Sequence, residues 1–170
     1  SNGSAEPGES GASGQPQLVD GKFDPPVTIT TVRRVVPAAS FKNGETIDDN
    51  VHYRWAKEKL GIEIQNLWSV TDTNNAYATK LKLALSSNEE MPDVLFASGK
   101  EAQMLIDSGK FRDAGELFDK YAGETWKKAM NENPEVWYEF TRDGKRYGIP
   151  NLDYDYNNDP VLWVRGDWRK

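Results

Sequence analysis

The six residues "DYDYNN" at positions 153–158 combine carboxylates, amides and phenol rings. Aromatic rings pack against the C–H faces of sugars, and planar acid and amide groups pair with vicinal hydroxyls. The stretch therefore predicts a carbohydrate-binding loop. A solvated loop held by Asx turns is the alternative. The candidate binding residues in this loop are Asp153, Tyr154, Tyr156 and Asn158.

The same loop has features of two other kinds of site, a calcium-binding loop and a hydrolase active site. It begins like a calcium-binding EF-hand loop, but Asn158 stands where glycine is needed and Val164 where a bidentate glutamate is needed. Asp153 and Asp155 are a pair of carboxylates such as a glycoside hydrolase uses. Nothing else in the sequence supports catalysis, so hydrolysis is kept only as an alternative to binding.

Composition excludes several further classes of site. The chain has no cysteine, which excludes disulfides, thiolate catalysis and cysteine-based zinc sites. The single histidine, His52, lies in a helical pattern and is read as part of a solvated helix face. We therefore predict no metal and no cofactor. The net charge of −6 without a basic stripe argues against nucleic acid, and no apolar run is long enough to span a bilayer.

The order of elements predicts an α/β fold. Alternation and β-branched residues predict strands at 27–36 and 62–70, and a continuously apolar run predicts a buried strand at 93–97. Helical spacing between these strands implies a mostly parallel sheet with helices on both faces. A helix capped by Asp48 or Asp49 is expected over residues 51–60, ending at Gly61, and a second is expected to be capped by Asp72 or Thr73. The residues expected in the core are Val27, Ile29, Val51, Trp55, Leu81, Leu85, Val94 and Leu95.

Later segments predict shorter elements. A helix is expected to stop at Gly109, followed by short helices broken near Gly123 and Pro134, and Asp143-Gly144 marks a hairpin turn. A final strand at 160–165 contains Trp163, which is read as core. Residues 1–21 are rich in Gly, Ser, Pro and Glu and are interpreted as a flexible linker, which leaves residues 22–170 for the fold.

Ligands in open α/β sheets bind beyond the carboxyl ends of the strands. That rule selects four stretches, at 36–41, 69–75, 97–100 and 151–158. The turn at 98–99 lies between an expected strand and a helix, so its amides could face a ligand, although an ordinary strand–helix turn explains it equally well. Outside the acidic loop, the candidate ligand-binding residues are Ser40, Phe41, Trp68, Asn74, Ser98 and Gly99.

Several segments together resemble the extracellular solute-binding proteins of bacterial ABC importers, in particular the lipoprotein branch that captures oligosaccharides. They are "YRWAKEKLGIEIQ", "ATKLKLALSSNEEMPDVLFASG", "IDSGKFRDAGELFDKY" and "DGKRYGIPN" followed by "LWVRGDW". Their order and spacing carry the likeness, which covers residues 27–170.

The resemblance implies a periplasmic-binding-protein-like fold of which this chain is the N-terminal part of lobe one. It implies a non-enzymatic protein that captures an oligosaccharide and delivers it to the membrane subunits of an ABC permease. A peptide-binding relative of the same fold is the alternative, since fold does not dictate ligand. By position in the family, Asp153, Tyr154 and Tyr156 would line the cleft. It also implies a location on the outer face of the cell membrane, through a lipid anchor, or in the periplasm; the lipid-bearing cysteine of the family is absent from this sequence.

Overall fold

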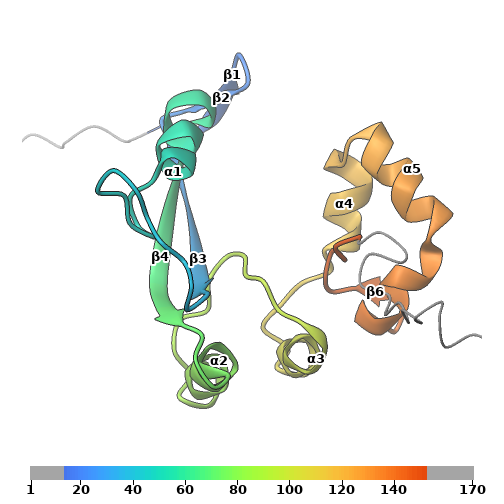
Figure 1. Ribbon diagram of the computed structural model, residues 1–170. Helices are drawn as coiled ribbons and strands as arrows, with labels where there is room; N and C mark the ends of the chain where they lie inside the picture. Colours follow the sequence, from blue (N-terminus) through green and yellow to red (C-terminus); the bar gives the residue numbers. More distant parts are fainter. Residues whose placement is uncertain (1–13, 153–170) are drawn as a thin grey trace, which may run out of the picture. The chain divides into compact units, whose positions relative to one another are not determined.

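The computed structural model describes residues 14–152. The chain divides into two compact units, Ser1–Ala97 and Ser98–Lys170, and each is described by itself. Figure 1 labels most of the helices and strands of both.

The first unit is built on one pair of parallel strands, β3 (Val27–Val35) and β4 (Ile62–Thr71). The register runs from Val27 opposite Ile62 to Val35 opposite Thr71, with a β-bulge between Thr31 and Val32. A short antiparallel hairpin, β1 (Gln17–Val19) and β2 (Lys22–Asp24), precedes them and begins inside the range expected to be linker. The strands expected at 27–36 and 62–70 are confirmed.

The crossover between β3 and β4 is helical, as the sequence predicts. It consists of α1 (Val51–Trp55), which continues directly into the π-helical turn η1 (Ala56–Leu60) and ends at Gly61 in the left-handed conformation. The cap is Asn50 and not Asp48 or Asp49. Its side-chain oxygen accepts from the amides of His52 and Tyr53, and its side-chain nitrogen donates to two carbonyls of the preceding loop.

That cap and one hydrogen bond set which side of the helix faces the strands. The Tyr53 hydroxyl donates to Asn66 on β4 at 2.7 Å, and Ala56, three residues further on, is buried. Val51 and Trp55 were expected in the core, and this is wrong, because the inward stripe runs through Tyr53, Ala56 and Leu60. Trp55 is 53% exposed.

Helix α2 (Ala76–Ser86) supplies the main core of the first unit. Tyr77, Leu81 and Ala84 are buried at helical spacing, and Leu81 is fully buried at 0% exposure. The expectation for Leu81 is confirmed, while the other apolar residues expected there, Val27, Ile29, Leu85 and Leu95, are half-buried.

The buried strand expected at 93–97 is not formed, so the predicted sheet lacks this strand. Val94 donates one backbone hydrogen bond to Thr30 of β3, at 3.2 Å. The Thr30 amide is taken by the side chain of Asp93, at 2.8 Å, and not by a backbone carbonyl. The segment therefore lies against β3 at one point, and both Val94 and Phe96 are exposed. Within residues 14–152, β3–β4 is the one parallel pair, so a mostly parallel sheet is not seen in this part of the chain.

The second unit is mainly helical. Its elements are α3 (Gly99–Asp107), α4 (Gly115–Tyr121), α5 (Glu124–Glu132), the 3₁₀ helix η2 (Pro134–Phe140) and a hairpin of β5 (Thr141–Arg142) with β6 (Lys145–Arg146). The predicted breaks near Gly123 and Pro134 are confirmed. Asp143 and Gly144 both have positive φ, as a type I′ hairpin turn requires.

The core of the second unit was missed in the sequence. It is a cluster of Phe118, Met130 and Trp137, and the rings of Phe118 and Trp137 meet edge to face at 5.2 Å. The guanidinium of Arg146 lies 4.7 Å from the Trp137 ring centroid and donates to Asp119 at 2.5 Å. The hairpin is thus held against the helices by a cation–π contact and an ion pair.

Candidate functional site

The candidate site of the first unit lies at the carboxyl end of β3 and β4. Because the strands are parallel and Val35 lies opposite Thr71, the loops that follow them leave the same edge. The amide of Asp72 donates to the carbonyl of Val35 at 2.8 Å, which extends the pairing by one step. The loops at 36–50 and 72–75 therefore start side by side, as the strand-end rule requires.

Asp72 fixes the second of these loops. Its carboxylate accepts from the backbone amide of Tyr77 at 3.1 Å, in the first turn of α2, and pairs with the guanidinium of Arg34 on β3. Asp72 thus helps to cap the helix, although Asn75, with φ 60°, is the residue that directly precedes it. The amide of Tyr77, and then Arg34, lower the pKa of Asp72 from its ordinary value.

An aromatic pair stands beside this loop. The rings of Trp68, near the end of β4, and Tyr77 on α2 lie 5.6 Å apart at 51°. Lys80 places its ammonium 5.7 Å from the Trp68 ring centroid, and the Tyr77 hydroxyl donates to the carbonyl of Phe96 at 2.6 Å. Trp68 is half-buried, so part of its ring is open to solvent while these neighbours restrain its orientation.

The sequence predicted Trp68 but missed Tyr77 and Lys80 as its neighbours. The available signal was helical spacing, because residues three apart lie on one side of a helix. That signal places Tyr77 and Lys80 together on α2, but it does not indicate which strand residue they meet.

The other candidates of the first unit lie in the two loops. Ser40 and Phe41 are exposed in the loop after β3, and Asn74 is exposed in the loop after β4. Asn74 has φ 54°, a conformation that asparagine tolerates better than most residues. The structure thus brings Trp68 and Asn74 to the same strand end and places Ser40 and Phe41 in the loop that leaves β3 at that edge.

Ser98 and Gly99 belong to the second unit, at the start of α3. Ser98 is the N-cap residue, and its hydroxyl donates to Glu101 at 3.0 Å. Gly99 has φ 33°, and a Cβ at this position would stand 3.9 Å from the Glu139 carboxylate, which is ordinary van der Waals contact. The strand expected before this turn is not formed, so Ser98 and Gly99 do not lie at the carboxyl end of a strand.

The four candidates of the acidic loop, Asp153, Tyr154, Tyr156 and Asn158, lie outside the described residues, as does the strand expected at 160–165. Within residues 14–152, no group of three or more His, Cys, Asp or Glu side chains is arranged to hold a metal ion.

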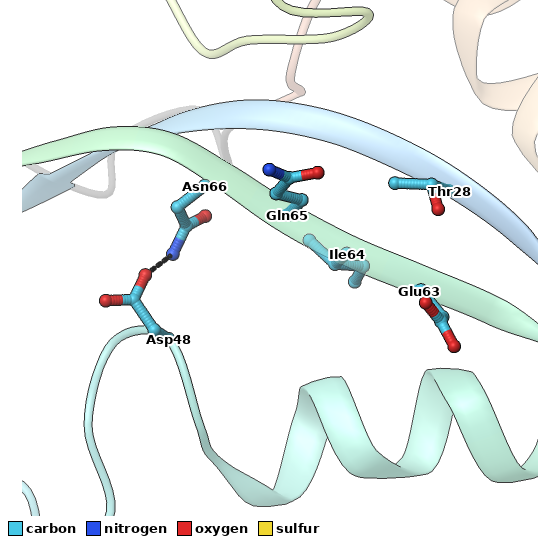
Figure 2. Close-up of a pocket in the computed structure, with 6 residues that line it drawn as sticks. All are labelled: Thr28, Asp48, Glu63, Ile64, Gln65 and Asn66. Carbon is cyan, nitrogen blue, oxygen red and sulfur yellow. Dashed lines mark hydrogen bonds between the residues drawn. The ribbon is translucent and has the colours of Figure 1, made fainter.

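A separate open pocket of about 400 Å³ lies along β4, away from the strand end (Figure 2). Three of its polar side chains already have partners: Asn66 donates to Asp48 at 2.8 Å, and Glu63 pairs with Lys57 at 2.8 Å. The lining residues are Thr28, Asp48, Glu63, Ile64, Gln65 and Asn66. With one aliphatic side chain and no aromatic ring in its wall, this pocket lacks the apolar lining of a typical small-molecule site.

Acid should weaken the first unit through Asp72 and Asp93. Hydrogen bonds from the amide and hydroxyl of Thr30 lower the pKa of Asp93, as the amide of Tyr77 does for Asp72. Because the folded pKa values lie below the unfolded value, the stabilisation is present above about pH 4 and is lost as the pH falls through the folded values. Urea unfolding at neutral and acidic pH should show Asp93→Asn less stable than the parent at neutral pH and less sensitive to acid.

The matched control for that variant is Asp20→Asn, in an exposed turn where φ is 50° and asparagine is well tolerated. It should follow the parent at both pH values. Equal acid sensitivity of Asp93→Asn and the parent would contradict the assignment.

Comparison with known protein families shows to which family the chain belongs. The sequence matches the family described as bacterial extracellular solute-binding protein over residues 38–165, which is more than half of the chain. The chain belongs to this family. No curated protein gives a significant match.

Membership of the solute-binding family implies a fold and a role. Solute-binding proteins have a periplasmic-binding-protein-like α/β fold, which the parallel β3–β4 pair and its helical crossover fit. They bind a small solute outside the cell membrane or in the periplasm and deliver it to the permease of an ABC importer, and they are generally not enzymes. None of the helices within the described residues is both long enough and apolar enough to cross a membrane.

Proposed function

We propose that this solute-binding protein captures a carbohydrate, an oligosaccharide, for its ABC permease. The observation that carries the proposal is the half-buried Trp68 ring, restrained by Tyr77 and Lys80, at the strand end where ligands bind in open α/β sheets. Family membership supports the capture of a solute, and the aromatic ring beside polar loops supports a sugar.

The restraint on Trp68 matters for affinity. A ring that is held before binding loses little rotational freedom when a ligand packs on it, which lowers the entropic cost of association. The loops that follow β3 and β4 supply hydrogen-bonding groups of the type that sugar hydroxyls need. We propose that Ser40 and Asn74 act in this way and that Phe41 adds a second apolar surface. The acidic loop residues Asp153, Tyr154, Tyr156 and Asn158 are proposed as further sugar-binding residues on the sequence argument alone.

The proposal extends to the organisation of the protein. Residues 22–170, together with strand β1, would form the N-terminal part of lobe one of a two-lobed protein. The residues before β1 would link it to a lipid anchor, and closure of two lobes would bury the solute. One lobe buries less of the ligand than a closed cleft does, so weak binding is expected for this chain alone.

Ligand class is best tested by a method that detects weak binding. The chain has six tryptophans, and each indole N–H gives its own signal in a proton–nitrogen correlation spectrum. We expect gluco-, manno- or xylo-oligosaccharides to shift the Trp68 signal and to leave that of Trp55, which is exposed on α1, in place. Trp68→Ala should weaken binding about tenfold, or about 1.4 kcal/mol, whereas Trp55→Ala should leave it unchanged.

Three outcomes would redirect the proposal. Shifts of Trp68 with short peptides but not with sugars would indicate a peptide-binding member of the family. Cleavage of the added oligosaccharide would indicate a hydrolase. Oligosaccharide binding that leaves the Trp68 signal unmoved would place the sugar site elsewhere.

A further inference from the structure

The loop between β3 and α1 contains an Asn-Gly pair, Asn43-Gly44, in an exposed turn. We propose that Asn43 is a site of spontaneous deamidation, which converts it to a mixture of aspartate and isoaspartate. The reaction needs no enzyme, and its only co-reactant is water.

The chemistry begins at the backbone amide of Gly44. This nitrogen loses its proton and attacks Cγ of Asn43, so that a new N–Cγ bond closes a succinimide ring. The Cγ–Nδ2 bond breaks, and the side-chain nitrogen takes up a proton and leaves as ammonia. Water then opens either carbonyl of the ring. Opening at one carbonyl gives aspartate, and opening at the other gives isoaspartate, in which the main chain runs through the former side chain.

The structure leaves the attacking nitrogen accessible. Lys42 to Glu45 form a turn closed by one hydrogen bond, from the amide of Glu45 to the carbonyl of Lys42, at 3.0 Å. Within residues 14–152, the amide of Gly44 donates no hydrogen bond. A Cβ placed on Gly44 would meet nothing within 4 Å, so no neighbouring group crowds the turn.

Within residues 14–152, Asn43 is the asparagine that a glycine follows; a second Asn-Gly pair, Asn2-Gly3, lies outside the described residues. Asn74, Asn75 and Asn88 are also exposed with positive φ. They are followed by Asn75, Ala76 and Glu89, whose side chains restrict the backbone and hinder approach to Cγ. Gly44 has no side chain and adopts conformations that the others cannot.

The modification has a physical consequence for the proposed site. It replaces a neutral amide by a carboxylate, which adds one negative charge to the net charge of −6. Isoaspartate also lengthens the main chain by one methylene in the loop that begins with Ser40 and Phe41. Aged protein would therefore be a mixture of charge forms that differ within one loop.

The test is peptide mapping by mass spectrometry after the full chain is incubated in mildly alkaline buffer at physiological temperature. Trypsin cleaves after Lys42 and Arg54, which isolates Asn43 from Asn88. We expect Asn43 to convert at least about tenfold faster than Asn88, a difference of about 1.4 kcal/mol in barrier. Methyl transfer to the peptide of residues 43–54 by an isoaspartate-specific methyltransferase should follow the same time course. The peptide of residues 1–22, which carries the Asn2-Gly3 pair, is scored separately.

Two variants separate the reaction from a general loss of structure. Asn43→Gln keeps an amide and Gly44 but would need a larger ring, and Gly44→Ala restores a side chain after Asn43. Both should suppress conversion in the tryptic peptide that begins at residue 43, and circular dichroism should confirm that they remain folded. Conversion of Asn88 as fast as Asn43 would overturn the proposal. So would an intact Asn43 in the protein under conditions where a synthetic peptide of residues 41–47 converts fully.

Discussion

Replacing Leu81 by alanine should lower the free energy of unfolding of the first unit by about 2 to 5 kcal/mol. Leu81 lies in the middle of α2 at 0% exposure and is the largest fully buried side chain of that unit. Truncation removes its buried methyl groups and leaves a cavity that the rigid neighbours Tyr77 and Ala84 cannot fill. Urea unfolding followed by circular dichroism measures the loss.

Leu83 on the same helix provides the matched control. It is 55% exposed. Leu83→Ala makes the same chemical change in the same helix, so the change in intrinsic helix propensity is the same. We expect a change within about 0.5 kcal/mol. Similar losses for the two variants would mean that α2 does not bury the face assigned to it.

Loss of Leu81 should also reach the candidate site. Tyr77 and Lys80 stand on the same helix and hold the ring of Trp68. If α2 loosens, these contacts weaken, and sugar-induced shifts of the Trp68 signal should shrink more in Leu81→Ala than in Leu83→Ala. The expectation rests on the proposed carbohydrate site, whereas the stability difference does not.

Much of the fold was predicted because its signals are local. Alternation identified β3 and β4, and the Asp-Gly pair at 143–144 identified the hairpin through its need for two positive φ angles. Gly61 was recognised as a helix end for a similar reason. In each case, the residue type itself restricts the backbone.

The failures involve partners that are distant in the sequence. An apolar run such as residues 93–97 fits a strand only if a neighbouring strand offers its backbone groups, and here the Asp93 side chain binds the Thr30 amide instead. Likewise, periodicity predicts a helix at 51–60 but fixes its inward side only loosely. The hydrogen bond from Tyr53 to Asn66 decides that side.

The candidate site was predicted in the same uneven way. The strand-end rule located Trp68 and Asn74 at the carboxyl end of β4, because strand direction is enough to find that edge. The neighbours of Trp68 come from a helix, and their contact depends on how α2 packs. The prediction for the turn at Ser98 and Gly99 depended on a strand at 93–97, and that strand is not formed.

Gly61→Ala should destabilise the first unit by about 2 to 4 kcal/mol, through two effects that add. Gly61 has φ 64°, a left-handed conformation that disfavours any side chain. A Cβ at this position would also stand 2.2 Å from the carbonyl oxygen of Phe23 in β2, which is far inside van der Waals contact. The close partner is backbone, so the hairpin β1–β2 must move away or the helix end must unwind.

Gly44→Ala separates the two effects. Gly44 has φ 73°, but a Cβ there meets nothing within 4 Å, so only the conformational penalty of about 1 to 2 kcal/mol remains. The excess loss in Gly61→Ala measures the clash with Phe23. Hydrogen exchange should then show faster amides in β1 and β2 for Gly61→Ala alone. If both variants lose the same stability and the hairpin amides stay protected, the hairpin does not pack against the end of η1, and Gly61 is required only for its left-handed turn.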